Sequence, residues 1–365
     1  MPFLTDHWQN PSSSYHSAKS VRDAIELARA RVATLIGSHP HEIVFTAGGS
    51  EANNMALKSL AREVGRTHSK VVMSAIEHSA VLRPIGAMSA VGFDVEPVGV
   101  DEEGRLDVDQ FRSAVDDSRP GFASIMWVNN ETGVIQPIEE AARIAKRAGW
   151  HFHTDAVPAA GKVPIRVDEV PVDYLSISGH KFHAPKGVGA LFIREGAPFE
   201  PMIRGGGQES GRRSGTENVA SLVGLGVAAE IAAEEIQNGM VNRVAALRDR
   251  LEAGLKSGLG ECPDGVVCNG SREHRTGNVA HLSFVGCRAS DLLAALDEAG
   301  VECSAGSACM AGKGKISHVL RAMGFDEARA LGGLRFSLSL FTTQDEIDEA
   351  VRRIVKVVLG LRQMA

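Results

Sequence analysis

The sequence predicts an α/β fold built on an open sheet, and three observations indicate it. Short apolar runs alternate with stretches of helical periodicity over most of the chain, an order typical of strand–helix–strand units. The run Phe122–Val128 is apolar almost throughout, as expected of a strand buried on both faces. Polar residues follow directly at Asn129–Gly133, where the carboxyl ends of such strands bind ligands. A ligand site is therefore expected at this edge.

The composition is that of an ordinary globular protein. At 365 residues the chain suits one large and one smaller domain, and a net charge of -6 argues against a nucleic-acid partner. No apolar run is long enough to span a bilayer, and the first residues show no secretory signal. Five cysteines, an odd number without a Cys-x-x-Cys pair, indicate a reducing compartment. A cytoplasmic protein is expected.

The individual elements follow from hydrophobic periodicity and from capping residues. We expect helices at 17–36, from Ser50, after His78, at 106–115, 138–148, 219–236, 241–255 and 290–299 (capped by Ser290), and after a capping box at 343–346. We expect strands at 42–45, 70–74, 93–100, 122–128, 150–155, 174–177, 187–193, 279–285, 301–303 and 334–338. The character of the chain changes after residue 255, so the predicted domains are 15–240 and 241–365, the latter with 1–14.

Three stretches carry side chains suited to chemistry. Strand 42–45 leads through Gly48 and Gly49 into a helix opened by Ser50, and such a helix N-terminus favours an anion, although a plain strand-to-helix turn is the commoner explanation. Lys181 lies at the tip of a turn between two apolar strands, where partial desolvation would favour a Schiff-base nucleophile over a plain surface lysine. Cys309, flanked by small residues with lysines beyond, favours a thiolate.

Histidines and the other cysteines admit plainer interpretations. His151, His153 and Asp155 alternate on one strand face and could suggest a metal site, but no companion cluster is found elsewhere in the sequence. A lone histidine after a strand, such as His78, is more often a capping or core residue than a catalytic one. Cys303 is expected to be a packed residue at a strand end.

Motifs along the whole chain resemble, in order, those of the cysteine desulfurases, the NifS/IscS-like group of pyridoxal-phosphate (PLP) enzymes. The matching segments are Asn10–His16, Phe45–Asn54, Glu77-His78, Val128–Gly133, Asp155-Ala156, Ser178–Lys181, Gly205–Thr216, Ser304–Cys309 and Leu334–Ser337. The resemblance implies the fold type I of PLP-dependent transferases. That fold has a large domain with a mainly parallel seven-stranded sheet and a smaller C-terminal α+β domain, in a homodimer with its active sites at the interface.

The resemblance also implies roles for individual residues. Those expected to bind PLP are Gly49, Ser50, Ser178, His180 and Thr216 of the neighbouring subunit (phosphate), His78 (ring and proton transfer), Asn130 (phenolic oxygen), Asp155 (ring nitrogen) and Lys181 (covalent attachment). Arg335 would grip the substrate carboxylate, because its planar fork suits a bidentate bond. Cys309 would take sulfur from L-cysteine as a persulfide, releasing L-alanine, and pass it to an acceptor such as an iron–sulfur scaffold or a tRNA-thiolation protein. No resident metal is expected, although Cys309 could transiently ligate an iron–sulfur cluster.

Three departures from the family pattern leave alternatives open. Pro158 stands where the family has glutamine, Ser339-Leu340 replace a Gly-Arg pair, and an earlier Asp-Asn-Ala-Thr-Thr-like segment is not found before Asn10. A selenocysteine lyase would share nearly all the motifs, and a class V aminotransferase would not need Cys309. A catalytically weakened paralogue kept as a partner-binding subunit is the alternative from a different class.

Overall fold

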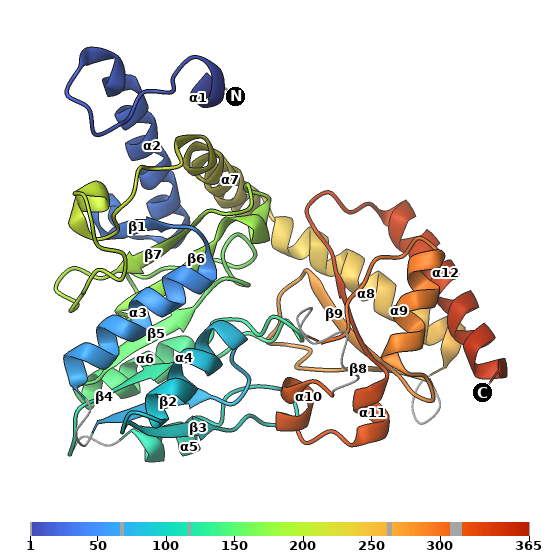
Figure 1. Ribbon diagram of the computed structural model, residues 1–365. Helices are drawn as coiled ribbons and strands as arrows, with labels where there is room; N and C mark the ends of the chain where they lie inside the picture. Colours follow the sequence, from blue (N-terminus) through green and yellow to red (C-terminus); the bar gives the residue numbers. More distant parts are fainter. Residues whose placement is uncertain (1, 66–68, 116–117, 261–264, 307–315, 365) are drawn as a thin grey trace. The chain divides into compact units, whose positions relative to one another are not determined.

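The computed structural model describes residues 2–65, 69–115, 118–260, 265–306 and 316–364 (Figure 1). Cys309 therefore lies outside the described residues. The chain divides into two compact units, and each contains several stretches of sequence. The first unit comprises Met1–Val98, Val108–Trp127 and Pro137–Asn238, and the second comprises Gly99–Asp107, Val128–Gln136 and Gly239–Ala365.

Within the described residues, the first unit is built on one sheet of seven strands in the order β1-β7-β6-β5-β4-β2-β3. Strand β7 runs antiparallel to its neighbours β1 and β6, whereas the other pairs are parallel. The prediction of a mainly parallel seven-stranded sheet is thus confirmed. The strands are β1 (Ile43–Thr46), β2 (Lys70–Ser74), β3 (Asp94–Val98), β4 (Gly121–Ser124), β5 (His151–Asp155), β6 (Tyr174–Ser178) and β7 (Gly189–Ile193).

Helices cover this sheet and bury its apolar side chains. Helix α3 crosses the central strands, and its Met55, Leu57 and Leu60 belong to a buried cluster with Val44 and Val71 from the sheet (Figure 1). Helices α2 and α7 pack along each other. The helices of this unit are α1 (Pro2–Thr5), α2 (Lys19–Ile36), α3 (Gly49–Val64), α4 (Ser79–Ser89), α5 (Val108–Ala114), α6 (Ile138–Arg147) and α7 (Val219–Gln237).

The second unit holds a three-stranded antiparallel sheet in the order β10-β9-β8. Helix α12 packs against α8 and α9, and Cβ atoms added at Gly254 and Gly258 would lie 2.8 and 2.6 Å from valine methyl groups of α12, so these two positions require glycine. The elements are β8 (Val266–Cys268), β9 (Val279–Phe284), β10 (Gly333–Ser337), α8 (Met240–Leu259), α9 (Ala289–Glu298), α10 (His318–Ala322), α11 (Glu327–Leu331) and α12 (Gln344–Met364).

Several local predictions differ from the structure. The strand predicted at 301–303 is wrong, because Val301 N instead donates to Leu296 O and closes helix α9; only the next residue, Ser304, forms a bridge, to Arg335. Strand β8 was not predicted, since it is three residues long within a polar, glycine-containing stretch. Ser290 is not a cap, because α9 begins one residue earlier, after Arg288.

At the two ends of the chain, one prediction is wrong and one is confirmed. Residues 1–14 belong to the first unit and not, as predicted, with the C-terminal part, because α1 packs against α7. The capping box before α12 is confirmed: Thr343 N donates to Glu346 and Glu346 N donates to Thr343 Oγ1. Among the described residues, every helix is too short or too polar to cross a bilayer.

Candidate active site

The turn between β1 and α3 forms a cradle at the carboxyl edge of the sheet. Gly48 has a φ of 149°, and a Cβ added at Gly49 would lie 2.4 Å from Val157 Cγ2, so side chains are excluded at both positions. Gly49 and Ser50 are the first two residues of α3, where backbone N–H groups lack partners within the helix and the dipole is positive. This turn can therefore hold an anion against the backbone.

Asp155 ends strand β5 as a carboxylate that is only 2% exposed. Its oxygens accept hydrogen bonds from Asn53 Nδ2 at 2.7 Å and from Val157 N at 3.0 Å. Burial raises the pKa of Asp155, while these bonds and the electrostatic influence of the nearby His78 and Lys181 lower it in part. The predicted ring partner thus lies within electrostatic reach of two other predicted site residues.

His78 is the N-cap of α4, which is the plainer of the two interpretations made from the sequence. Its Nδ1 accepts from Ala80 N at 3.1 Å, so the neutral imidazole carries its proton on Nε2. The neighbouring Glu77 is fully buried; Ser74 Oγ and Met126 N donate to its Oε1 at 2.6 and 2.7 Å. Burial is the main cause that raises the pKa of Glu77 to about 8.

Lys181 lies on the short 3₁₀ helix Gly179–Phe182, which directly follows β6. Lys181 lies beyond the last residue of β6 and is exposed within the single chain, whereas the sequence predicted partial desolvation between two apolar strands. Ser178 Oγ and His180 Nδ1 are 3.0 Å apart at the base of the same turn. A Cβ at Gly179 would lie 2.8 Å from Leu225 Cδ1, so the turn is held close to α7.

Thr216 is exposed and lies at the end of the loop 205–216. A cavity of about 190 Å³ has both this loop and the end of β1 in its wall, including Phe45, Ala47, Arg213 and Thr216. The first unit thus contains the cradle, the end of β5 with Asp155, the turn with Lys181 and the loop 205–216. The sequence placed these residues far apart along the chain, and the sheet topology brings them to one edge.

Arg335 and Asn130 lie together in the second unit. Arg335 Nη1 donates to the backbone oxygen of Asn130 at 2.6 Å, and Ser304 and Arg335 exchange two backbone hydrogen bonds. The buried Arg335 Nε has no hydrogen-bond partner within the described part of the chain. Burial lowers the pKa of Arg335, and the charge of Glu131 raises it in part. A donor is therefore available for an anionic ligand.

Neither Glu131 nor Ser317 was among the predicted site residues. Glu131 is 1% exposed and accepts a hydrogen bond from Ser317 Oγ at 2.5 Å, while a Cβ at Gly306 would lie 3.3 Å from the same carboxylate oxygen. Gly306 and Ser317 flank residues 307–315, which contain Cys309. The polar run after Val128 pointed to this strand end but gave no partner for Glu131.

The histidine-rich strand has a structural explanation. Both ring nitrogens of the buried His153 are engaged, by Ser124 Oγ at 2.8 Å and Ser176 Oγ at 3.1 Å, and burial lowers its pKa to about 3. His151 lies 3.6 Å from Asp173, away from Asp155. Among the described residues, no group of three His, Cys, Asp or Glu side chains could hold a metal ion.

Comparison with known proteins identifies the family. Residues 1–350 match the Aminotransferase class-V family, so the chain belongs to that family. It is 44% identical to a cysteine desulfurase of Gluconacetobacter diazotrophicus and 43% identical to the cysteine desulfurase NifS of Azotobacter vinelandii, covering all of this chain and 90% and 89% of those proteins. Within the class-V family it therefore belongs with the cysteine desulfurases.

Solved structures agree with this placement. A NifS-like protein superposes with a TM-score of 0.90 at 36% identity, covering 98% of this chain and 94% of that one. A NifS-like protein from Rickettsia africae gives 0.84 at 30% identity, with 95% and 91% covered.

The cofactor of this family is PLP, and the site described above fits it. A cradle that excludes a Cβ at Gly49 suits a phosphate group approached by backbone. The buried Asp155, already held by Asn53, suits a cationic ring nitrogen. The individual roles of the predicted site residues stay predictions.

Glu77 provides a pH-dependent test of the site's electrostatics. Between the ordinary glutamate pKa of 4.5 and the raised pKa of about 8, this group is protonated when folded and ionised when unfolded, so its contribution to stability falls as pH rises. Glu77→Gln keeps an acceptor for Ser74 and Met126 but cannot ionise. We expect the free energy of unfolding, measured in urea, to fall less steeply between pH 5 and pH 8 in Glu77→Gln than in wild type. The two slopes should differ by up to about 1.4 kcal/mol per pH unit.

The exposed Glu102 supplies the control for this measurement. Glu102→Gln removes a carboxylate without touching a buried group, and it should leave the wild-type slope unchanged. Parallel slopes for Glu77→Gln and wild type would show that Glu77 is already ionised in the folded protein.

Proposed function

We propose that the protein is a PLP-dependent cysteine desulfurase, which converts L-cysteine to L-alanine and takes the sulfur atom onto Cys309 as a persulfide. The observation that carries the proposal is the grouping at one sheet edge of the glycine cradle, the buried Asp155 and the Lys181 turn. Names of relatives that match over the whole chain support the same activity and do not favour the selenocysteine lyase or weakened-paralogue alternatives.

The residues of the first unit would bind and orient the cofactor. PLP, when bound, supplies an electron-withdrawing ring and a reactive carbonyl group. The start of α3 with Gly49 and Ser50 would hold the phosphate, joined by Ser178, His180 and a neighbouring subunit's Thr216. Asp155 would keep the ring nitrogen protonated, because a buried carboxylate is most readily stabilised by a nearby cation.

His78 and Lys181 are the groups that would move protons. His78 has Nδ1 engaged by Ala80 N, so only Nε2 is left to exchange a proton. Lys181 is exposed and within electrostatic range of Asp155, and its amine can serve both as the attachment point and as a base. The cap therefore fixes which imidazole nitrogen takes part.

Arg335 is the residue that would hold the substrate. Arg335 is fixed by its bond to Asn130 O, and its Nε lacks a partner within the described residues, which leaves a donor for the carboxylate of L-cysteine. Asn130 itself would approach the phenolic oxygen of the cofactor with its side chain. Its backbone oxygen is also the acceptor for Arg335. The position of Asn130 would therefore affect both its own predicted contact with the cofactor and that of Arg335 with the substrate.

The sulfur step uses Cys309. Its thiolate would bond to the substrate sulfur while the substrate's carbon–sulfur bond breaks. The electron pair of that bond stays with carbon, which takes a proton to give alanine. An acceptor thiolate would then bond to the outer sulfur of the Cys309 persulfide while its S–S bond breaks, which returns Cys309 to the thiolate. An iron–sulfur scaffold or a tRNA-thiolation protein fits this chemistry as the acceptor. Assembly as a homodimer and location in the cytoplasm stay predictions.

Two substitutions should separate the cofactor and sulfur roles. Lys181→Ala should abolish alanine formation and change the visible absorption of bound PLP. Cys309→Ala should retain PLP through desalting, yet form alanine from L-cysteine more slowly by roughly 100-fold or more. Cys303→Ala is the matched control, because burial raises the pKa of Cys303 to about 11 and keeps its thiol neutral. Wild-type turnover in Cys309→Ala would reject the persulfide assignment.

Thr216 should act on the neighbouring subunit. In a mixture of Thr216→Val and Lys181→Ala subunits, each heterodimer would carry one site with both lesions and one with neither. Random pairing would then restore about one quarter of wild-type activity. If heterodimers form and activity does not rise above that of the separate variants, Thr216 serves its own subunit.

A further inference from the structure

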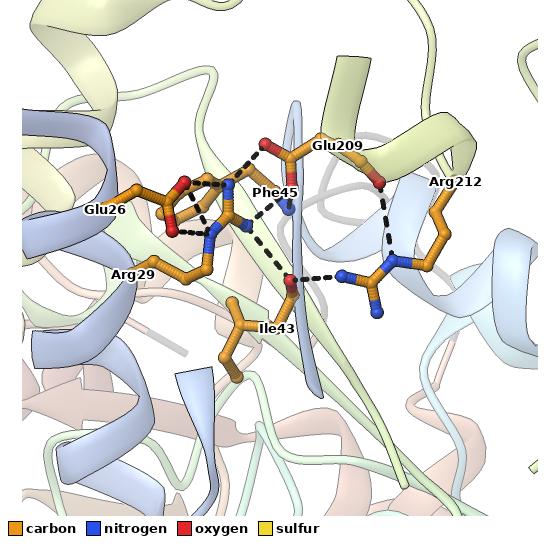
Figure 2. Close-up of polar contacts among 6 residues, drawn as sticks. All are labelled: Glu26, Arg29, Ile43, Phe45, Glu209 and Arg212. Carbon is orange, nitrogen blue, oxygen red and sulfur yellow. Dashed lines mark hydrogen bonds and ion pairs between the residues drawn. The ribbon is translucent and has the colours of Figure 1, made fainter. Parts of the chain in front are cut away.

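A buried carboxylate, Glu209, anchors the loop 205–216 to the rest of the first unit (Figure 2). Its Oε2 accepts from Arg29 Nη1 at 2.7 Å and from Phe45 N at 2.9 Å, and its Oε1 accepts from Arg29 Nη2 at 2.9 Å. The carboxylate thus joins three segments: the loop, helix α2 and strand β1.

Arg29 is itself buried and has partners on every side (Figure 2). It donates to Ile43 O at 3.0 Å, pairs with Glu26 at 3.2 Å, and lies 4.6 Å from the centre of the Phe45 ring. Burial alone lowers the pKa of Arg29, but the bonds and charge of Glu209 raise it above its ordinary value. Forked, fully bonded pairs of this kind hold geometry tightly, and leaving one ion without the other is strongly unfavourable.

The backbone at Glu209 is in a conformation that needs such support. Glu209 and Ser210 have φ of 50° and 57°, in the left-handed region that residues with a side chain rarely adopt. Strained residues persist when surrounding contacts determine them, and they gather at functional sites. The ion pair supplies those contacts at Glu209.

The same loop is held a second time, next to the cradle. Arg213 Nε donates to Glu51 Oε1 at 2.9 Å, and Glu51 Oε2 accepts from Ala47 N at 2.8 Å. Glu51 is in the first turn of α3, and Phe45 lies four residues before Gly49. The loop is therefore bonded to β1 on one side of the cradle and to α3 on the other, with Thr216 at its end.

We propose that the Arg29–Glu209 pair is a positioning device for the cofactor's phosphate site. It sets the loop that carries Arg213 and Thr216 against the cradle, although neither member of the pair is among the residues that would contact PLP. The inference rests on the proposed function, in that it takes the cradle as the PLP phosphate site. Its consequence is that PLP affinity depends on an ion pair buried behind β1.

Asp173 offers a matched control within the same unit. It is also a buried carboxylate that accepts a backbone N–H, from Phe152 at 2.7 Å, and pairs with a cation, Lys146 at 2.5 Å. It directly precedes β6 and so lies at the edge of the sheet opposite Ser178 and Lys181. A loss of stability alone should affect both variants, whereas a loss of positioning should affect only Glu209.

The experiment compares Glu209→Gln, Arg29→Lys and Asp173→Asn with wild type. After removal of PLP, rebinding is titrated by absorbance, and each variant's folding is checked by thermal unfolding. We expect the PLP dissociation constant to rise about tenfold or more in Glu209→Gln, which removes the charge of the pair, and less in Arg29→Lys, which keeps the charge and loses only the fork. Asp173→Asn should stay within about twofold of wild type.

A second measurement does not involve the cofactor. Trypsin cleaves after arginine, and Arg212 and Arg213 lie on the loop, so cutting there reports how firmly the loop is held. With PLP removed, Glu209→Gln should be cut at these residues faster than both wild type and Asp173→Asn. Arg29→Lys serves the same comparison if Glu209→Gln does not fold, because it keeps the charge and loses the fork.

The positioning role and the proposed function would be contradicted by different results. A folded Glu209→Gln or Arg29→Lys with the same PLP affinity and cleavage rate as Asp173→Asn would overturn the positioning role. Wild-type protein that does not rebind PLP would overturn the proposed function instead, and the cleavage comparison would still decide whether the pair positions the loop.

Discussion

The first unit depends on keeping charged side chains buried at the carboxyl edge of its sheet. Asp155 is almost fully enclosed, and a carboxylate there is tolerable only because Asn53, a backbone N–H and nearby positive charges stabilise it. Helix α3 supplies the Asn53 side chain one turn after it supplies the cradle at Gly49. The position of α3 on the sheet therefore fixes the anion site and the carboxylate at the same time.

A second buried carboxyl group lies two strands from β5 in the sheet, after the end of β2. Glu77 is fully buried between β2 and the chain that follows β4, and Met126 N donates to it where a longer strand would pair with a neighbour. Strand β4 ends at Ser124 and not at Val128 as predicted, although Ile125 N and Trp127 N still donate to backbone oxygens of β5. A polar side chain thus takes the place of a neighbouring strand for Met126 N at the carboxyl edge, where open α/β sheets bind ligands.

The fold could be predicted largely because its signals are local. Apolar runs such as Phe122–Val128 and the capping box at Thr343 identify elements from neighbouring residues alone. The side-chain pairs that were not predicted join residues distant in the chain: Arg29 and Glu209 are 180 positions apart, and Glu131 and Ser317 are 186 apart. The hydrophobic periodicity of a sequence does not identify such pairs. The exposure of Lys181 in the single chain was not predicted for a related reason, since the apolar strands on either side of the turn do not reveal how far its side chains are covered.

The antiparallel strand β7 governs when the cradle can form. Strand β1, which leads into the cradle, has β7 as its partner in the described sheet, with Ile43 opposite Phe192. A ribosome adds about 5–20 residues per second, so β1 waits roughly 7–30 s after its own synthesis before β7 emerges to pair with it. Until then the apolar run Ile43–Phe45 is open to other contacts on the nascent chain. The part of the protein encoded early is consequently completed late, and chaperones that shield emerging strands have most to protect there.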